Sequence, residues 1–326
     1  MVGFEDSQKR IFAEKYNNHT GGLLYRCPAK VDKGFNFDYC VFIPNGINAQ
    51  TSLLIQIPNY SASLKTTNIE EQINYEYEIF KGFKSHIHLC NNISKFPILY
   101  PLIPRKWDNV KKEEIFTHML SSNALFCTDE QFSRIDIQII NMMDDLKERL
   151  EKNNINIDSK VIVEGFSATA KFANRFTLLH PEIVKLCIAG AIGGCLTLPI
   201  REIEKENLIY PVGIGNIKEI TDKKIKEFKN VKQFYYQSID DNIDAFISTT
   251  KTSYVPCNPG VIKKDDLKQL YNYLGRDMLN ERFHNTKKIY AQEKVNATFK
   301  IYPSGGHSPL VAVEDITALF LQEVAK

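Results

Sequence analysis

Residues 161–181 read VIVEGFSATAKFANRFTLLHP, and their hydrophobic pattern changes at a serine. The first three residues are apolar and β-branched, as expected of a buried parallel strand. After Ser167 the larger apolar residues recur at helical spacing, at Phe172, Phe176 and Leu179. The stretch therefore predicts a strand, a sharp turn at the serine and then a helix.

A serine on such a strand-to-helix turn can act as a nucleophile. The turn lifts its hydroxyl out of the sheet, and the N–H of the next residue, here Ala168, points at the group that the hydroxyl attacks. Gly165 and Ser167, two positions apart, are alone a weak signal, because such a pair also forms an ordinary turn in which the serine caps the helix. The position favours the nucleophile, because a strand precedes it, a helix follows it, and acid and base candidates lie downstream.

Composition and charge narrow the class of protein. The chain has 326 residues, of which 43% are hydrophobic and 25% charged, and its formal net charge is +2. These values predict a single large globular domain over residues 1–326. A charge so close to zero argues against nucleic acid or an anionic membrane as the partner and favours a small molecule.

The sequence also bears on location and on cofactors. The N-terminal residues lack a basic region followed by an apolar run, and no stretch is long enough to span a bilayer, so we expect a cytoplasmic protein without membrane insertion. The seven cysteines are odd in number and widely spaced, which predicts reduced thiols. His86 and His88 alternate on an expected strand, but without a third ligand nearby they indicate a polar strand face. We expect no metal and no organic cofactor.

Strands and helices alternate along the chain, which predicts a mostly parallel, doubly wound α/β sheet flanked by helices. Residues 1–35 are expected to form an irregular or edge segment. Residues 195–230 and 242–290, which follow the strands ending near 190 and 237, are expected to leave the sheet and form a cap or the walls of a pocket. The expected strands are 39–46, 52–58, 96–101, 161–163, 184–190, 231–237 and 297–302, and the expected helices are 132–150, 168–180, 265–290 and 315–324.

Ser167, the pair Asp240 and Asp241, and His307 each follow an expected strand, in that chain order. A serine hydroxyl is a poor nucleophile until a histidine accepts its proton, and the histidine needs a carboxylate to fix its tautomer. Of the seven histidines, only His307 follows a late strand in a Gly-Gly loop. Adjacent side chains of an extended segment face opposite ways, so only one of the two aspartates is expected to reach His307.

From about Phe37 onward, the chain resembles bacterial α/β-hydrolases of the esterase and polyhydroxyalkanoate-depolymerase-like group. The resemblance rests on IPN at 57–59, YPLIPR at 100–105, TH at 117–118, RIDIQ at 134–138, FANRF at 172–176, LHP at 179–181, GG at 193–194, YPVG at 210–213 and GH at 306–307. It implies the α/β-hydrolase fold and a serine hydrolase that cleaves a carboxylic ester. In that group the acid strand ends G-x-x-D, which favours Asp240 as the acid, although Gln237 then stands at the glycine position.

Two N–H groups are expected to form an oxyanion hole. One belongs to Ala168, and the other to Tyr60 or Ser61 in a loop that Asn59 fixes.

The elbow departs from the usual G-x-S-x-G, because Thr169 replaces the second glycine. This departure leaves open a second class, a binding or regulatory protein on the same fold with a relaxed, inactive elbow. A peptidase or thioesterase would use the same three residues and also stays open.

Overall fold

The computed structural model describes residues 17–19, 21–59, 66–82, 85–106, 116–244 and 264–324. Within these ranges nine strands form one sheet in the order β1-β2-β3-β6-β5-β8-β9-β12-β13. The pairs from β1 to β6 are antiparallel, and those from β6 through β13 are parallel. The strands are β1 (Asn17–His19), β2 (Gly22–Cys27), β3 (Tyr39–Pro44), β6 (Ile98–Pro101), β5 (Leu54–Gln56), β8 (Val161–Phe166), β9 (Val184–Gly190), β12 (Lys232–Ser238) and β13 (Ala297–Tyr302).

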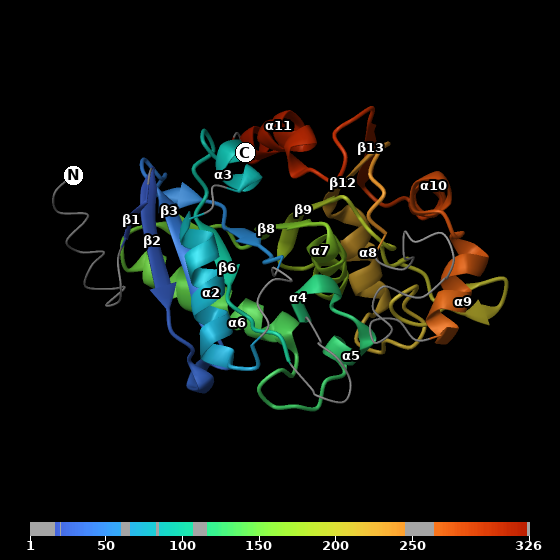
Figure 1. The fold of residues 1–326 in the computed structure, drawn as a ribbon, viewed down its shortest axis with the longest axis horizontal. Coiled ribbons are helices and arrows are strands. Elements are labelled where there is room, and N and C mark those ends of the chain that lie inside the picture. Colours follow the sequence, from blue (N-terminus) through green and yellow to red (C-terminus); the bar gives the residue numbers. More distant parts are fainter. Residues whose placement is uncertain are drawn as a thin grey trace.

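Helices cover both faces of this mostly parallel sheet, as the sequence predicted (Figure 1). Helix α7 packs against β8 and β9, while α11 contacts α3. The helices are α2 (Ile69–Gly82), α3 (His86–Cys90), α4 (Phe116–Met119), α5 (Ser122–Leu125), α6 (Ile135–Glu151), α7 (Ala168–Leu179), α8 (Asp222–Asn230), α9 (Lys264–Tyr273), α10 (His284–Gln292) and α11 (Val313–Val324), with a π-helical turn at Met278–Phe283. No helix in these described ranges has the length and apolar character needed to cross a bilayer.

The structure refines one local prediction and contradicts another, the strand expected at His86 and His88. Residues 1–35 were expected to form an irregular or edge segment, and in the described part of it Gly22–Cys27 is regular: it is strand β2, which pairs along its whole length with β3 and lies next to the edge strand β1. His86 and His88 lie on helix α3, where they bond to different partners, Glu164 and Ser85. The described residues contain no cluster of side chains that could hold a metal ion.

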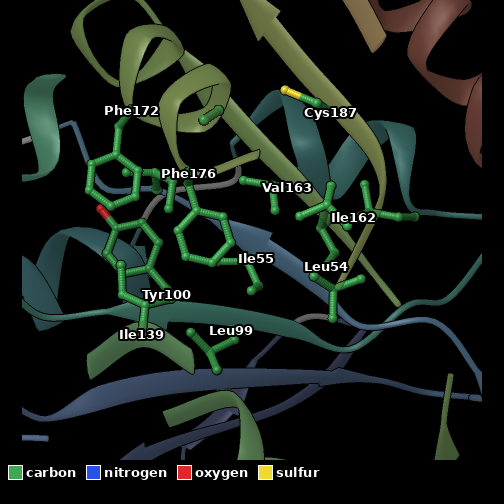
Figure 2. Packing of buried hydrophobic residues seen from close by; sticks show 14 of the residues in the cluster. Leu54, Ile55, Leu99, Tyr100, Ile139, Ile162, Val163, Phe172, Phe176 and Cys187 are labelled. Atoms are coloured by element: carbon green, nitrogen blue, oxygen red, sulfur yellow. The ribbon is translucent and has the colours of Figure 1, made fainter. Parts of the chain in front are cut away.

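Part of the main core lies between β8 and α7. Val161, Ile162 and Val163 are fully buried because β5 and β9 flank β8 and helices cover its faces. Figure 2 shows Phe172 and Phe176 of α7 directed at the apolar side chains of the neighbouring strands. Burial of each such side chain contributes about 1.5–3 kcal/mol, so the elbow joins two rigidly packed elements.

A second, smaller apolar cluster connects the two expected excursions. It joins residues of 195–212 to residues of α9 and to α4. Its buried members are Met119, Cys195, Leu198, Leu208, Val212, Leu270 and Leu274. Residues 195–230 also contain the hairpin of β10 (Glu202–Ile203) and β11 (Glu206–Asn207) and helix α8. Residues 195–212 thus pack on α9 and on Leu274, which follows it.

Polar side chains on α7 bond to the segment that follows β9. Asn174 Oδ1 accepts the N–H of Thr197 at 2.9 Å, and Arg175 Nε donates to Thr197 Oγ1 at 3.1 Å. Both α7 residues are fully buried. Because buried polar groups are costly unless they are hydrogen-bonded, these contacts select one position of the excursion over α7.

Candidate active site

The elbow has the strained geometry that the sequence predicted. Ser167 lies between β8 and α7 with φ 62° and ψ −121°, in a region of backbone conformation that favours glycine. Its N–H donates to the carbonyl of Gly190 at 2.8 Å, which ties the elbow to the end of β9. A Cβ on Gly165 would lie 2.2 Å from the carbonyl oxygen of Thr169, so this position requires glycine.

Thr169, at the usual second glycine, does not relax this turn. Its Oγ1 accepts the N–H of Phe166 at 3.0 Å and donates to the carbonyl of Phe166 at 2.9 Å. Its side chain is fully buried. The hydroxyl therefore bonds the first turn of α7 to the last residue of β8, and Ser167 keeps its positive φ.

The serine and the histidine, 140 residues apart in sequence, meet at the ends of β8 and β13. Ser167 Oγ lies 2.7 Å from His307 Nε2. The other ring nitrogen, Nδ1, lies 2.9 Å from Asp241 Oδ2 and 3.0 Å from Asp241 Oδ1. The Asp241 side chain is fully buried, whereas that of His307 is a quarter exposed. In this arrangement Nδ1 donates to the carboxylate, which leaves Nε2 to accept the serine proton.

The expectation that Asp240 faces the histidine was wrong. Asp240 accepts the N–H groups of Gly306 at 2.8 Å and of Gly305 at 3.2 Å, and these bonds lower its pKa. The chain turns after Ser238, where the N–H of Asp241 donates to the carbonyl of Ser238 at 3.2 Å. Since the segment is a turn, the alternation of an extended strand does not apply to it. With Asp241 in the acid position, the G-x-x-D spacing places Ser238 rather than Gln237 at the glycine.

The residues that were predicted to supply the oxyanion donors are described only in part. Ala168 begins α7, where the first N–H groups have no partner within the helix. Asn59 is exposed and follows β5, and the preceding strand end lies beside β8, because the N–H of Ile57 donates to the carbonyl of Glu164 at 3.0 Å. Tyr60 and Ser61 lie outside the described residues, and both donors of the oxyanion hole stay predictions.

Sequence reasoning missed two buried contacts around this site. His86 Nε2 lies 3.1 Å from Glu164 Oε1, behind the elbow, and the His86 ring lies against Phe166, which in turn contacts the His307 ring. Gln237 bonds to Asp241 at 2.9 Å. No signal in the sequence pairs these residues, since a glutamine or histidine in an apolar run has no fixed partner until the fold is known.

No protein-family model matches this chain, and no curated protein matches it in sequence. Solved structures do match. A poly(3-hydroxybutyrate) depolymerase from Bordetella parapertussis is similar with a TM-score of 0.54 at 14% identity, over 97% of this chain and 94% of that chain. Poly(aspartic acid) hydrolase-1 from Sphingomonas sp. KT-1 is similar with a TM-score of 0.51 at 15% identity, over 88% of this chain and 96% of that chain.

At these identities the similarity shows a shared fold. The chain therefore has the α/β-hydrolase fold, as its sequence motifs implied. Its strand order and its elbow between β8 and α7 agree with that class.

Proposed function

We propose that this protein is a serine hydrolase that cleaves a carboxylic ester, with Ser167 as nucleophile, His307 as base and Asp241 as acid. The observation that carries the proposal is the 2.7 Å contact between Ser167 Oγ and His307 Nε2, made while Asp241 holds Nδ1. A geometry this close is needed for proton transfer from the hydroxyl. The fold shared with the depolymerase and the poly(aspartic acid) hydrolase supports hydrolysis as the reaction class.

The reaction proceeds in two halves. Ser167 Oγ bonds to the acyl carbon and its proton passes to His307 Nε2, while the Asp241 carboxylate stabilises the imidazolium. The Ala168 N–H, with a second donor predicted at Tyr60 or Ser61, stabilises the oxyanion. His307 then returns the proton to the departing alcohol, which leaves an acyl-enzyme. Water then gives a proton to His307 and bonds to the acyl carbon. The bond between this carbon and Ser167 Oγ breaks, Oγ takes the proton back from His307 Nε2, and the acid is released.

The strained backbone of Ser167 argues against the alternative of a binding or regulatory protein. A φ of 62° at a serine costs free energy. Such strain is typical of sites at which the side chain has a function, and a protein that did not use the Ser167 hydroxyl would not need this conformation. A peptidase or thioesterase would share the first chemical step, so only the substrate that the protein cleaves distinguishes these activities from an esterase.

Labelling with a fluorophosphonate probe tests the nucleophile. The wild type should be labelled once per chain, and Ser167→Ala should abolish labelling and the hydrolysis of a panel of acyl esters. Ser308→Ala is the matched control, because Ser308 neighbours His307 and its Oγ accepts the N–H of Leu310. Labelling that persists in Ser167→Ala would sink the assignment. A panel of thioesters and peptides, offered alongside, separates the ester reading from the other two.

A further inference from the structure

Gln237 is buried at the end of β12 and bonds to two segments. Its Oε1 accepts the N–H of Ile192 at 2.8 Å, and its Nε2 donates to Asp241 Oδ2 at 2.9 Å. Its side chain is about 1% exposed, so water does not compete for either bond.

The chemistry of the two partners fixes the orientation of this amide. A backbone N–H can only donate, so the atom of Gln237 that faces Ile192 has to be the oxygen. The NH₂ group then faces the carboxylate of Asp241, which accepts. The opposite orientation would place an oxygen against the carboxylate and an NH₂ against an N–H.

The bond to Ile192 connects the acid to the segment that holds the nucleophile. Gly190, at the end of β9, accepts the N–H of Ser167, and Ala191 donates its N–H to the carbonyl of Tyr236 on β12. Two residues beyond Gly190, the N–H of Ile192 is held by Gln237. The segment 190–192 is thus bonded to the elbow on one side and to β12 on the other, and Gln237 extends this connection to Asp241.

We propose that Gln237 is a positioning residue that holds the Asp241 carboxylate in register with His307, a role that rests on the proposed function. The Asp241 Oδ2 atom accepts Gln237 Nε2 and faces His307 Nδ1, and Oδ1 accepts the N–H of Ile243 at 3.0 Å. These donors define the plane of the carboxylate. Without the one from Gln237, Oδ2 has no donor among the described residues besides His307, and only the N–H of Ile243 still orients the carboxylate, which can then turn more easily away from Nδ1.

Gln237→Met tests this role, because methionine keeps the length of the side chain and removes both hydrogen bonds. The loss of one hydrogen bond to a charged group predicts a fall in kcat of about 10- to 100-fold. KM should stay within about twofold, since Gln237 acts on the acid and not on bound substrate.

A double-mutant cycle separates positioning from a general loss of structure. In an Asp241→Ala background, Gln237→Met should change kcat by less than about twofold, because its effect passes through Asp241. A residue that only supports the fold would lower kcat by the same factor in both backgrounds, and that result would overturn the proposal.

Gln233→Met is the matched control on the same strand. Gln233 is equally buried, but its Nε2 donates to the carbonyl of Phe228 and its Oε1 accepts from Tyr235, away from the site. Its replacement should lower the melting temperature and leave kcat within about twofold. If Ser167→Ala retains activity, the proposed function fails; if Ser167→Ala is inactive while Gln237→Met matches wild type, only the role of Gln237 fails.

Discussion

Asp241 Oδ2 lies 2.9 Å from His307 Nδ1, while the adjacent Asp240 bonds instead to the backbone of the loop that carries this histidine. The two carboxylates therefore hold His307 in different ways. Asp241 fixes the ring, and Asp240 fixes the Gly305–Gly306 backbone just before it. Gly306 has φ 58°, so a backbone restraint at this point limits a residue that would otherwise be free to turn.

Exchanging each aspartate for asparagine should separate these tasks. Asp241→Asn presents an amide to Nδ1 and favours the wrong tautomer, so kcat should fall about 10⁴-fold. Asp240→Asn keeps an oxygen that can accept from Gly306, so kcat should fall less than about tenfold. Steady-state kinetics on one ester measures both. A larger loss in Asp240→Asn than in Asp241→Asn would contradict the assignment.

The stability and the activity of the protein should depend more on the hydroxyl of Thr169 than on the size of this side chain. Thr169→Val keeps the shape but leaves the N–H of Phe166 without its partner, which should lower the free energy of unfolding by about 1–3 kcal/mol and reduce kcat. Thr169→Ser keeps the hydroxyl, so its free energy of unfolding and its kcat should both be close to those of wild type. Denaturant unfolding and ester kinetics on the two variants provide the measurement. Equal behaviour of valine and serine at this position would show that the bonds to Phe166 are unimportant.

Much of the fold could be predicted because central parallel strands such as β8 and β9 are buried on both faces, while β13 at the edge of the sheet is only partly buried. The expected strands 184–190 and 297–302 coincide with β9 and β13, and the expected turn at Ser167 is present. An apolar run between turn residues has few alternatives in an α/β chain. Ser167 and His307 were predicted as a pair because Ser167 directly follows an expected strand and His307 lies in the loop after another.

The choice between Asp240 and Asp241 depended on a turn that the local sequence does not define. Whether the chain is extended or turned after Ser238 is decided by bonds to distant groups, such as the N–H of Ile239 to the carbonyl of Tyr302. The partner of Gln237 likewise depends on β9 lying beside β12. Contacts of this kind are set by the tertiary structure, so periodicity alone could not predict them.

Asp136 anchors the start of α6 to the end of α7, and its removal should destabilise the fold. Burial alone would raise its pKa, but hydrogen bonds from His180 and Arg134 outweigh burial and lower the pKa to about 2. A lowered carboxyl pKa stabilises the fold above the ordinary value near 3.8, and this stability is lost as the pH falls toward 2. Burial would lower the pKa of His180, but the same contact raises it above its ordinary value. The stability that His180 contributes is therefore present below pH 6.5 and is lost as the pH rises through the raised pKa.

Asp136→Asn should therefore lower the free energy of unfolding by about 3–5 kcal/mol, most strongly between about pH 4 and 6.5. Denaturant unfolding across that pH range measures the difference from wild type. Asp144→Asn is the control, because Asp144 lies on the same helix but is exposed. If the two variants are equally stable, the buried contact with His180 does not stabilise the fold.

Lys171, one turn after Ser167 on α7, should make the stability of the protein depend on pH in the alkaline range. The side chain is fully buried, and burial, together with the nearby charge of Arg175, lowers its pKa from 10.5 to about 7. Its Nζ donates to the carbonyl of Gly193 at 2.5 Å, a bond that the neutral amine can also make. Between these two pKa values the unfolded chain binds a proton that the folded chain does not. The free energy of unfolding should thus rise with pH, by up to about 1.4 kcal/mol per unit from this group.

Lys171→Met removes this amine. The slope of the unfolding free energy against pH, between pH 7 and 10, should therefore be smaller than in wild type by up to about 1.4 kcal/mol per pH unit. As the pH falls toward 7, the free energy of unfolding of the variant should rise relative to that of wild type, because its folded state does not bury an amine that favours protonation. Lys223→Met serves as the control, because the Lys223 side chain is 83% exposed, and its removal should leave the slope as it is in wild type. Equal slopes in wild type and Lys171→Met would mean that Lys171 stays protonated in the folded protein, with its charge compensated by groups around it.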